Sequence, residues 1–291
     1  EENCLRQEDG KLLLPPESKA AGAQIYWKKW LPDGKPKALV LLVHGYAEHS
    51  GRYQYFAKHC LERGYAVYAM DHWGHGKSDG TPGFVPDFSV FHDGVDQLLA
   101  RAEQDFPDLP VMLVGHSMGG LISATYLLSN QSKFAACVLS GPAVKAAEEP
   151  SAFLKAISGL LSRFFPKLGV LELDPNGVSR DPEVVADYLA DPLVYNGKMG
   201  ARLAAEMLGN MTRIQENSWQ ISLPMLLLHG GKDSLAAAEG SKYLDSHIAS
   251  IDKSLKIYPE LFHEIFNEPE KDEVLNDMTD WLDKRLSANK G

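Results

Sequence analysis

Short runs of apolar residues recur along the chain, and they alternate with longer stretches in which apolar residues keep helical spacing. The runs Ala38–Val43 and Val111–Gly115 contain no charged or polar side chain, which is typical of strands buried on both faces of a sheet. Stretches such as Ser89–Asp105 lie between these runs and fit amphipathic helices. The alternation predicts an α/β fold, in which helices cover both faces of a mostly parallel central sheet.

The predicted elements extend over most of the chain, and the first strands differ from the later ones. Gln24–Trp30 alternates polar and apolar residues like a half-exposed strand, and we expect it to pair antiparallel with Lys11–Leu14. Further strands are predicted at Ala38–Val43, Ala66–Met70, Val111–Gly115, Ala135–Ser140, Pro224–His229 and Leu255–Tyr258. Helices are predicted at Tyr53–Arg63, at Ser89–Asp105 and from Met118 onward.

The strand pattern stops after Gly141-Pro142 and resumes only after Ser222. The stretch between these points shows no strand pattern, and it is too long for a plain connecting loop. We therefore predict a helical cap at residues 142–222, inserted into a core domain made of residues 1–141 and 223–291.

One strand, Val111–Gly115, runs directly into the motif Gly115-His116-Ser117-Met118-Gly119 and a predicted helix. Glycines two positions before and after Ser117 permit a sharp strand-to-helix turn, which lifts the serine hydroxyl above the sheet edge. The N-terminus of the new helix directs its free N–H groups at the same point. This context predicts Ser117 as a nucleophile; the alternative is a glycine-rich turn without chemistry.

A nucleophilic serine needs a base that takes its proton and a third group that orients the base. In this kind of sheet the expected chain order is serine, acid, histidine, so the partners should lie downstream. Asp233 follows the apolar strand Pro224–His229 in a tight loop, and His263 follows the strand Leu255–Tyr258. Both residues are expected at the carboxyl edge of the sheet, where Ser117 also lies.

Other acids and histidines beyond Ser117 are weaker candidates. His229 ends a strand but precedes the acid, and His247 lies in a helical pattern on an expected solvated face. Asp245 and Asp252 lie on the same stretch as Asp233 but do not follow a strand directly.

A third requirement is a site for the oxyanion of the tetrahedral intermediate. The apolar strand Ala38–Val43 ends in His44-Gly45-Tyr46, and such a turn can supply one backbone N–H, here that of Tyr46. The second donor is the N–H of Met118, which follows the nucleophile. His44 itself is expected to stabilise the loop by hydrogen bonds rather than to act in catalysis.

Several segments resemble the monoacylglycerol lipases and related lysophospholipases of the α/β-hydrolase superfamily. The segments are HGYAEHSGRY (residues 44–53), DHWGHGKSDG (71–80) and GHSMGG (115–120), and the strand Leu255–Tyr258 followed by His263 fits the same pattern. The resemblance extends from about Gln24 to Leu286 and is weakest in the predicted cap. It implies the α/β-hydrolase fold and hydrolysis of carboxylic esters of small lipids through an acyl-enzyme, without a metal or cofactor.

The resemblance also implies a polar pocket for a glycerol head group. Glu48, Arg52 and His116 match pocket positions of the family's loop motifs, and Tyr188 matches a pocket tyrosine of the cap. The alternatives are that Glu48 and Arg52 form an ion pair that only braces the loop, and that Tyr188 is ordinary cap packing. Phe266 stands where these lipases often carry a second histidine, so one head-group contact is expected to be missing. This difference predicts appreciable activity on simple alkyl esters as well as on monoacylglycerols.

One helix of the predicted cap carries an apolar stripe with i, i+3, i+4 spacing. Its members are Phe153, Ala156, Ile157, Leu160, Leu161, Phe164 and Phe165. The stripe is expected to pack against the core or to line the acyl pocket. The alternative is transient contact with a membrane or lipid surface, which the flanking Lys155, Arg163 and Lys167 would suit if the lipid were anionic.

Composition narrows the range of partners and compartments. The formal net charge of −10 argues against a nucleic-acid partner. No apolar stretch approaches the roughly 20 residues that span a bilayer. Cys4, Cys60 and Cys137 show neither metal-ligand spacing nor a disulfide framework, which favours a reduced, cytoplasmic enzyme.

Four other functions use the same residues and stay open at this point. A general carboxylesterase, a lysophospholipase and an acyltransferase would share the catalytic machinery, and an acyltransferase would also have to exclude water. A peptidase of this fold would cleave amides. A non-catalytic binding protein is disfavoured, because it would have little need of a complete set of serine, acid and histidine.

Overall fold

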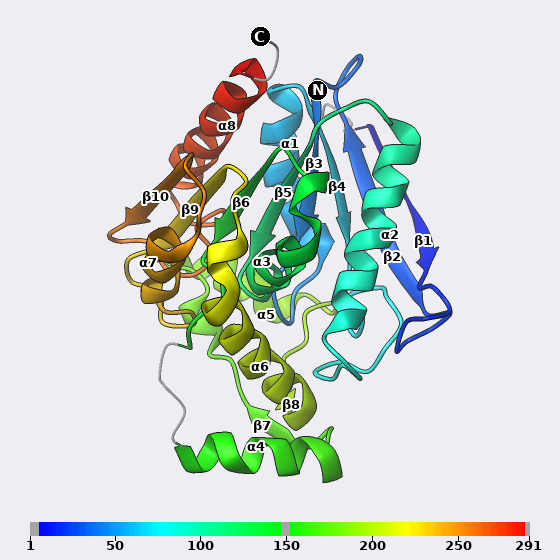
Figure 1. Ribbon diagram of the computed structural model, residues 1–291, viewed down its shortest axis with the longest axis vertical. Helices are drawn as coiled ribbons and strands as arrows, with labels where there is room; N and C mark the ends of the chain where they lie inside the picture. Colours follow the sequence, from blue (N-terminus) through cyan, green and yellow to red (C-terminus); the bar gives the residue numbers. More distant parts are fainter. Residues whose placement is uncertain (1–5, 147–151, 289–291) are drawn as a thin grey trace.

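An eight-stranded sheet runs through the centre of the protein in a computed structural model, which describes residues 6–146 and 152–288 (Figure 1). Its strands are β1 (Arg6–Leu13), β2 (Gln24–Leu31), β3 (Ala38–Val43), β4 (Tyr65–Met70), β5 (Val111–His116), β6 (Ala136–Ser140), β9 (Met225–Gly230) and β10 (Lys253–Tyr258). Their order across the sheet is β1-β2-β4-β3-β5-β6-β9-β10. The pairs β1–β2 and β2–β4 are antiparallel, and all later pairs are parallel. The antiparallel first pair and the mostly parallel sheet are as the sequence predicts, whereas the antiparallel β2–β4 pair was not predicted.

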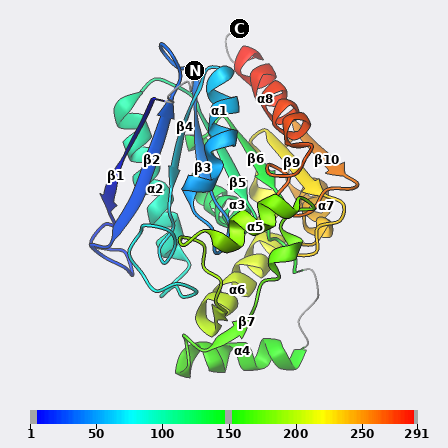
Figure 2. The ribbon, with the colours of Figure 1, turned by 180° about the vertical axis from the view of Figure 1, so that it is seen from behind.

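Helices cover both faces of this sheet (Figures 1 and 2). The helices that pack on the core are α1 (Gln54–Glu62), α2 (Ser89–Asp105), α3 (Met118–Asn130), α7 (Ala238–His247) and α8 (Lys271–Ala288), with short 3₁₀ turns η1 (Ser50–Tyr53) and η2 (Gln131–Lys133). Successive β3 residues point to opposite faces: Leu41 joins the apolar cluster under α2 and α3, and Leu42 joins the cluster under α1 and α8. Both faces of the strand are therefore dry, which explains its unbroken apolar sequence.

We use the term cap for the segment between β6 and β9. Its described elements are α4 (Ala152–Phe164), β7 (Gly169–Leu171), η3 (Pro175–Gly177), α5 (Pro182–Ala190), β8 (Met199–Gly200), α6 (Ala201–Asn217) and η4 (Ser218–Gln220). The strands β7 and β8 pair antiparallel, so the expectation that this segment contains no strand is wrong. These strands are too short to show an alternating pattern, and only their pairing across the cap makes them strands.

The cap joins the core through backbone hydrogen bonds at the loops that follow the strands. Tyr195 N donates to Ala47 O at 2.8 Å, and Gly200 N donates to Gly83 O at 2.7 Å. The helix α6 also buries Leu203 in the same apolar cluster as β3 and α3. The first cap helix, α4, is different, because it lies at the far end of the molecule and packs on α6 (Figures 1 and 2).

Candidate active site

Ser117 lies at the sharp turn between β5 and α3, in a backbone conformation that side-chain-bearing residues rarely adopt. Its φ is 53° and its ψ is −119°. The turn is held because Ser117 N donates to Ser140 O at 3.0 Å, and Gly120 N donates to Ser117 O at 2.9 Å. A Cβ atom on Gly119 would stand 2.1 Å from Val43 O, so only glycine lets α3 begin this close to β3. The two flanking strands thus fix the serine at the carboxyl edge of the sheet.

The structure brings Ser117, His263 and Asp233 into one hydrogen-bonded chain. His263 Nε2 lies 2.8 Å from Ser117 Oγ, and His263 Nδ1 lies 2.7 Å from Asp233 Oδ2. With Nδ1–H donating to the carboxylate, Nε2 is left to accept the serine proton. Asp233 follows β9 and His263 follows β10, so the three residues come from the ends of separate parallel strands.

Burial and charge set the protonation of this chain. Burial alone would raise the pKa of Asp233, but His263 and the hydrogen bonds from both neighbouring histidines lower it well below its usual range. Burial lowers the pKa of His263, but the Asp233 carboxylate and the nearby Glu264 raise it more, so the net pKa is raised. Asp233 is therefore held as an anion, and its charge favours the protonated form of His263.

His229, which sequence reasoning sets aside as a base, supports the acid instead. Its buried ring has Nε2 at 3.1 Å from Asp233 Oδ2 and at 3.1 Å from Ala236 O. Both partners are acceptors, so Nε2 carries the hydrogen, and Nδ1 accepts from Ser241 Oγ at 2.7 Å. Its place at the end of β9, just before the acid, was the only sequence signal for this role.

The loop after β3 lies directly against Ser117. A Cβ atom on Gly45 would stand 3.1 Å from Ser117 Cβ, so the loop approaches as closely as glycine allows. The next residue, Tyr46, lines the pocket beside Ser117. On the other side, Met118 is the first residue of α3, where backbone N–H groups lack intrahelical acceptors. Tyr46 follows Gly45 in this loop and Met118 follows Ser117 in the chain, and these are the two residues whose amides the sequence predicts as oxyanion donors.

His44 stabilises this loop, as expected. Its Nδ1 donates to Gly45 O at 2.7 Å, and its Nε2 accepts from His72 N at 3.1 Å. Burial and the neighbouring His72 and His75 hold its pKa well below the usual range, so the ring stays neutral.

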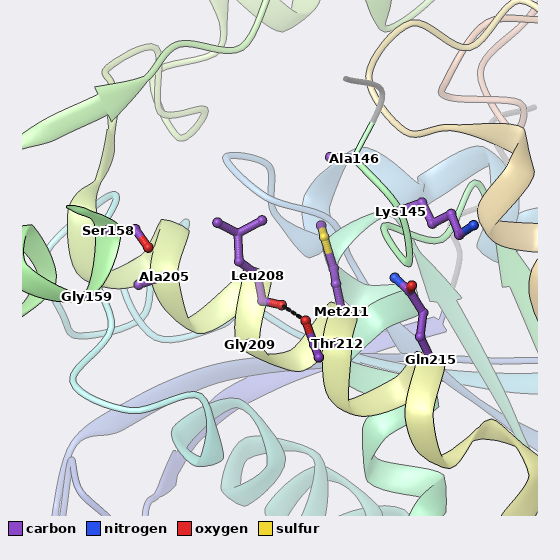
Figure 3. Close-up of a pocket in the computed structure, with 10 residues that line it drawn as sticks. All are labelled: Lys145, Ala146, Ser158, Gly159, Ala205, Leu208, Gly209, Met211, Thr212 and Gln215. Carbon is purple, nitrogen blue, oxygen red and sulfur yellow. Dashed lines mark hydrogen bonds between the residues drawn. The ribbon is translucent and has the colours of Figure 1, made fainter. Parts of the chain in front are cut away.

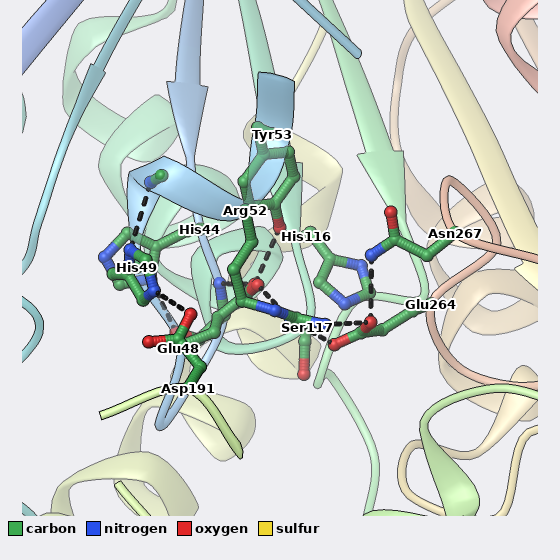
Figure 4. A network of polar contacts seen from close by, with 12 residues as sticks. His44, Glu48, His49, Arg52, Tyr53, His116, Ser117, Asp191, Glu264 and Asn267 are labelled. Carbon is green, nitrogen blue, oxygen red and sulfur yellow. Dashed lines mark hydrogen bonds and ion pairs between the residues drawn. The ribbon is translucent and has the colours of Figure 1, made fainter. Parts of the chain in front are cut away.

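A buried guanidinium lies between two buried carboxylates beside Ser117 (Figure 4). Arg52 donates to Glu264 through both terminal nitrogens, at 2.6 and 2.8 Å, and to Glu48 Oε2 at 2.9 Å. Glu48 Oε1 accepts from Gly45 N at 2.7 Å and from Tyr53 Oη at 2.6 Å. Glu264 was missed by the sequence analysis, because no local pattern marks it as the partner of Arg52.

Tyr188 and His116 complete the polar side of the pocket. Arg52 Cζ lies 4.8 Å from the ring centroid of Tyr188, so the cap tyrosine packs on the guanidinium. The His116 ring centroid lies 4.8 Å from that of His263, and His116 Nδ1 is 3.0 Å from Ser140 O. Burial, and then the positive charge that His263 can carry, lower the pKa of His116 to about 3. His116 is therefore a neutral neighbour of the base.

Phe266, whose position the resemblance assigns to the head-group site, is not among the residues that line the pocket beside Ser117. Its ring is buried in the apolar cluster under α1 and α8, 5.2 Å from the ring of Phe56. The turn after His263 directs this side chain away from the reaction centre, whereas Glu264 faces the pocket.

The pocket beside Ser117 is narrow and is closed partly by the cap. Its cavity volume is about 10 Å³, which is about the space that one water molecule needs. Its lining residues are Gly45, Tyr46, Glu48, His116, Ser117, Leu173, Val178, Tyr188, Leu235, His263 and Glu264. Glu264 N donates to Val178 O of the cap at 2.8 Å, so the loop that carries the base is tied to the pocket roof.

A second pocket lies between α4 and α6, on the outer side of the cap (Figure 3). Ala205, Leu208 and Met211 of α6 contribute to its lining, and Lys145 lies at one end. None of the residues that line it belongs to the hydrogen-bonded chain at Ser117, so it is not the reaction centre.

Comparison with known families decides the class of protein. The family model described as serine aminopeptidase, S33 (Hydrolase_4) matches residues 34–270. The chain belongs to this family of serine hydrolases. It is 43% identical over 265 residues to a monoacylglycerol lipase of Mycolicibacterium smegmatis, with 91% of this chain and 95% of the relative covered.

Further relatives point the same way. The human monoglyceride lipase is 34% identical over 278 residues, which cover 94% of this chain and 92% of that protein. The crystal structure of a monoacylglycerol lipase from Paleococcus ferrophilus superimposes with a TM-score of 0.81 at 32% identity, and covers 90% of this chain and 99% of that chain. The predicted α/β-hydrolase fold and the resemblance to the monoacylglycerol lipase branch are thus confirmed.

Proposed function

We propose that this serine hydrolase cleaves monoacylglycerols through a covalent acyl-enzyme. The observation that carries the proposal is the unbroken contact from Asp233 through His263 to Ser117, at the mouth of a pocket with one polar side. The similarity to monoacylglycerol lipases over nearly the whole chain supports the substrate class.

In the proposed mechanism His263 Nε2 takes the Ser117 proton while Oγ attacks the ester carbonyl carbon. The amides of Tyr46 and Met118 donate to the oxyanion, and each such donor lowers the barrier by about 3 kcal/mol. Protonated His263 then gives its proton to the leaving alcohol, and an acyl-Ser117 ester forms. A water molecule, deprotonated by the same imidazole, repeats the attack and releases the fatty acid.

We assign the alcohol part of the substrate to the polar side of the pocket, formed by Glu48, Arg52, His116 and Tyr188. Much of the hydrogen-bonding capacity of Glu48 and Arg52 is used within their own ion-pair network. Their main effect is therefore on the shape and charge of this side of the pocket. Phe266 lies outside the pocket, so it no longer gives a reason to expect a weakened preference for monoacylglycerols.

The test compares specificity constants for a monoacylglycerol, a methyl ester and a triacylglycerol of the same fatty acid, with Ser117→Ala as the blank. We expect the monoacylglycerol to be the best substrate, and the triacylglycerol to be poor because a narrow capped pocket must admit the whole alcohol part. Preference for the triacylglycerol would overturn the proposed substrate. Cleavage of an aminoacyl anilide without ester turnover would favour a peptidase instead.

We also propose that the cap makes transient contact with a lipid surface. No helix within residues 6–146 and 152–288 is long and apolar enough to cross a membrane. However, Leu160, Phe164 and Phe165 are 60%, 62% and 62% exposed at the end of α4, and the exposed Leu168 and Leu171 follow in sequence. Arg163 lies beside them. The side chains of Phe153, Lys155, Ala156 and Ile157 lie outside the described residues.

Such a cluster suits insertion of a cap edge into the surface layer of a membrane. Cosedimentation with phosphatidylcholine vesicles, with and without phosphatidylglycerol, tests the contact. Phe164→Ser with Phe165→Ser should abolish vesicle binding, and Trp219→Ser, an exposed aromatic in η4, is the matched control. Equal binding of all these proteins would contradict the proposal.

For the compartment we propose the cytoplasm. Cys60 and Cys137 are buried free thiols, and burial raises the pKa of both. Unpaired, unreactive thiols of this kind fit a reducing compartment. Cell fractionation of the tagged protein is the direct test.

A further inference from the structure

The tyrosines divide sharply by what their hydroxyl groups contact. Six buried tyrosines each donate to a carboxylate: Tyr26, Tyr53, Tyr65, Tyr68, Tyr126 and Tyr258. Among the partly exposed ones, Tyr55 also donates to a carboxylate, and Tyr195 and Tyr243 donate to backbone carbonyls. Within the described part of the chain, the hydroxyls of Tyr46 and Tyr188 have no such partner, and both residues line the pocket beside Ser117.

The Tyr46 hydroxyl is the more exceptional of the two. The side chain is only 7% exposed, and its oxygen is fully buried with no hydrogen-bond partner among the described residues. A buried phenol left without a hydrogen-bond partner destabilises the fold, so proteins rarely keep one. In a substrate pocket, the missing partner is most simply supplied by the substrate.

The surroundings of Tyr46 place its phenol at the seam between core and cap. The ring is edge-on to His75 at 5.9 Å, and the neighbouring Ala47 O accepts from Tyr195 N of the cap at 2.8 Å. Burial, followed by the nearby phenols of Tyr195 and Tyr188, raises the pKa of the Tyr46 hydroxyl. The group therefore stays protonated and can donate a hydrogen bond at any ordinary pH.

We propose that the Tyr46 side chain, acting with Tyr188 from the cap, hydrogen-bonds a free hydroxyl of the substrate's alcohol part and so determines specificity. An aliphatic acyl chain offers no atom that could satisfy a phenol. Glu48 and Arg52 are largely occupied by each other, Glu264, Tyr53 and the Gly45 amide. Together with the neutral His116, the two phenols are then the groups of the pocket that can recognise a hydroxyl-bearing alcohol such as glycerol.

This inference rests on the proposed monoacylglycerol hydrolysis and adds a role that differs from that of the Tyr46 backbone amide. A site that hydrogen-bonds a substrate hydroxyl discriminates against analogues that lack it, because its own polar group is then left unpaired. Tyr46→Phe removes the hydroxyl but keeps both the amide and the ring. The substitution should therefore change selectivity between alcohols without changing the machinery that attacks the carbonyl.

The experiment measures kcat/KM of wild type, Tyr46→Phe and the control Tyr195→Phe on a monoacylglycerol and on the methyl ester of the same acid. We expect Tyr46→Phe to lower kcat/KM for the monoacylglycerol about tenfold more than kcat/KM for the methyl ester, mainly through KM. Tyr195→Phe should leave both constants unchanged. Labelling of Ser117 by a fluorophosphonate measures how much serine is reactive in each protein.

Two outcomes would overturn the inference while leaving the proposed function intact. Equal losses on both esters would show that the phenol acts on the ester group or on the fold rather than on the alcohol. No loss on either ester would show that a water molecule satisfies the hydroxyl in the complex. Failure of the proposed function is distinct, because wild-type protein would then show no monoacylglycerol hydrolysis at all.

Discussion

Arg52 and Glu264 form a bidentate ion pair that links the loop that carries His263 to the loop beside Ser117. Glu264 directly follows His263. Arg52, which donates to Glu264, also donates to Glu48, and Glu48 accepts from the Gly45 amide. One buried network therefore touches both the segment that contains His263 and the segment that contains Tyr46. The alternative in which Glu48 and Arg52 brace the loop fits this geometry.

Glu264→Gln should damage stability and turnover together. The change leaves the guanidinium without its main partner, and breaking a buried ion pair from one side costs about 3–5 kcal/mol. We expect a clear fall in the denaturation midpoint and a lower kcat on esters of different alcohols alike. Glu260→Gln is the control, because its side chain is 63% exposed in a surface pair with Lys232. If both variants unfolded at the same denaturant concentration, the ion-pair network would not stabilise the fold.

We predict that Ser117 is needed for turnover and that its strained backbone lowers the stability of the fold. Ser117→Ala should abolish fluorophosphonate labelling and lower ester turnover at least about a thousandfold. Ser117→Gly should be equally inactive but more stable than Ser117→Ala by about 1 kcal/mol, because glycine relaxes at a φ of 53°. Urea denaturation of both variants measures the difference. Near-normal turnover of pure Ser117→Ala would remove the serine from its assigned role.

His229 is predicted to act through Asp233. Removing one hydrogen bond to a buried carboxylate costs about 1.5–3 kcal/mol, so His229→Phe should lower kcat about ten- to a hundredfold with KM little changed. His229→Gln keeps a donor near Asp233 and should recover part of the loss. A loss confined to KM, or a full loss in His247→Phe at the exposed end of α7, would contradict this role.

The pH dependence of kcat/KM should reflect the pKa of His263, which Asp233 raises. His263 must be neutral to accept the Ser117 proton, and Asp233 raises its pKa, so kcat/KM should fall as pH drops below this raised value. Asp233→Asn removes the charge, which lowers the pKa of His263 and moves the acid limb to lower pH. The same variant should lose about 10⁴ in kcat. Asp245→Asn, in α7, should leave both the acid limb of the kcat/KM profile and the value of kcat unchanged.

Asp233 and His263 should make the stability of the folded protein depend on pH in opposite directions. The pKa of Asp233 is lower in the folded protein than in the unfolded chain, so its stabilising effect is present near neutral pH and is lost as pH falls through the folded pKa. The pKa of His263 is raised, so its stabilising effect is present below the unfolded pKa and is lost as pH rises through the folded pKa. Denaturation midpoints measured across pH, in wild type and Asp233→Asn, test both signs.

Local sequence was enough to predict the sheet and the positions of Ser117, Asp233 and His263. The strands β3 and β5 are buried on both faces, so their apolar runs are unbroken and visible in one dimension. The turn at Ser117 needs glycine on both sides, and the sequence shows these glycines two positions before and after the serine. Parallel strands end at one edge, so residues that follow them meet without any further information.

Only the tertiary structure decided what surrounds these residues. Arg52 and Glu264 are 212 positions apart, and no periodicity connects a guanidinium to a carboxylate at that distance along the chain. The direction of a side chain in a loop was equally invisible: Glu264 faces the pocket and Phe266 the core, although both closely follow His263. The unpaired hydroxyl of Tyr46 became apparent only when all its neighbours were in place, since burial and hydrogen bonding depend on the whole packed fold.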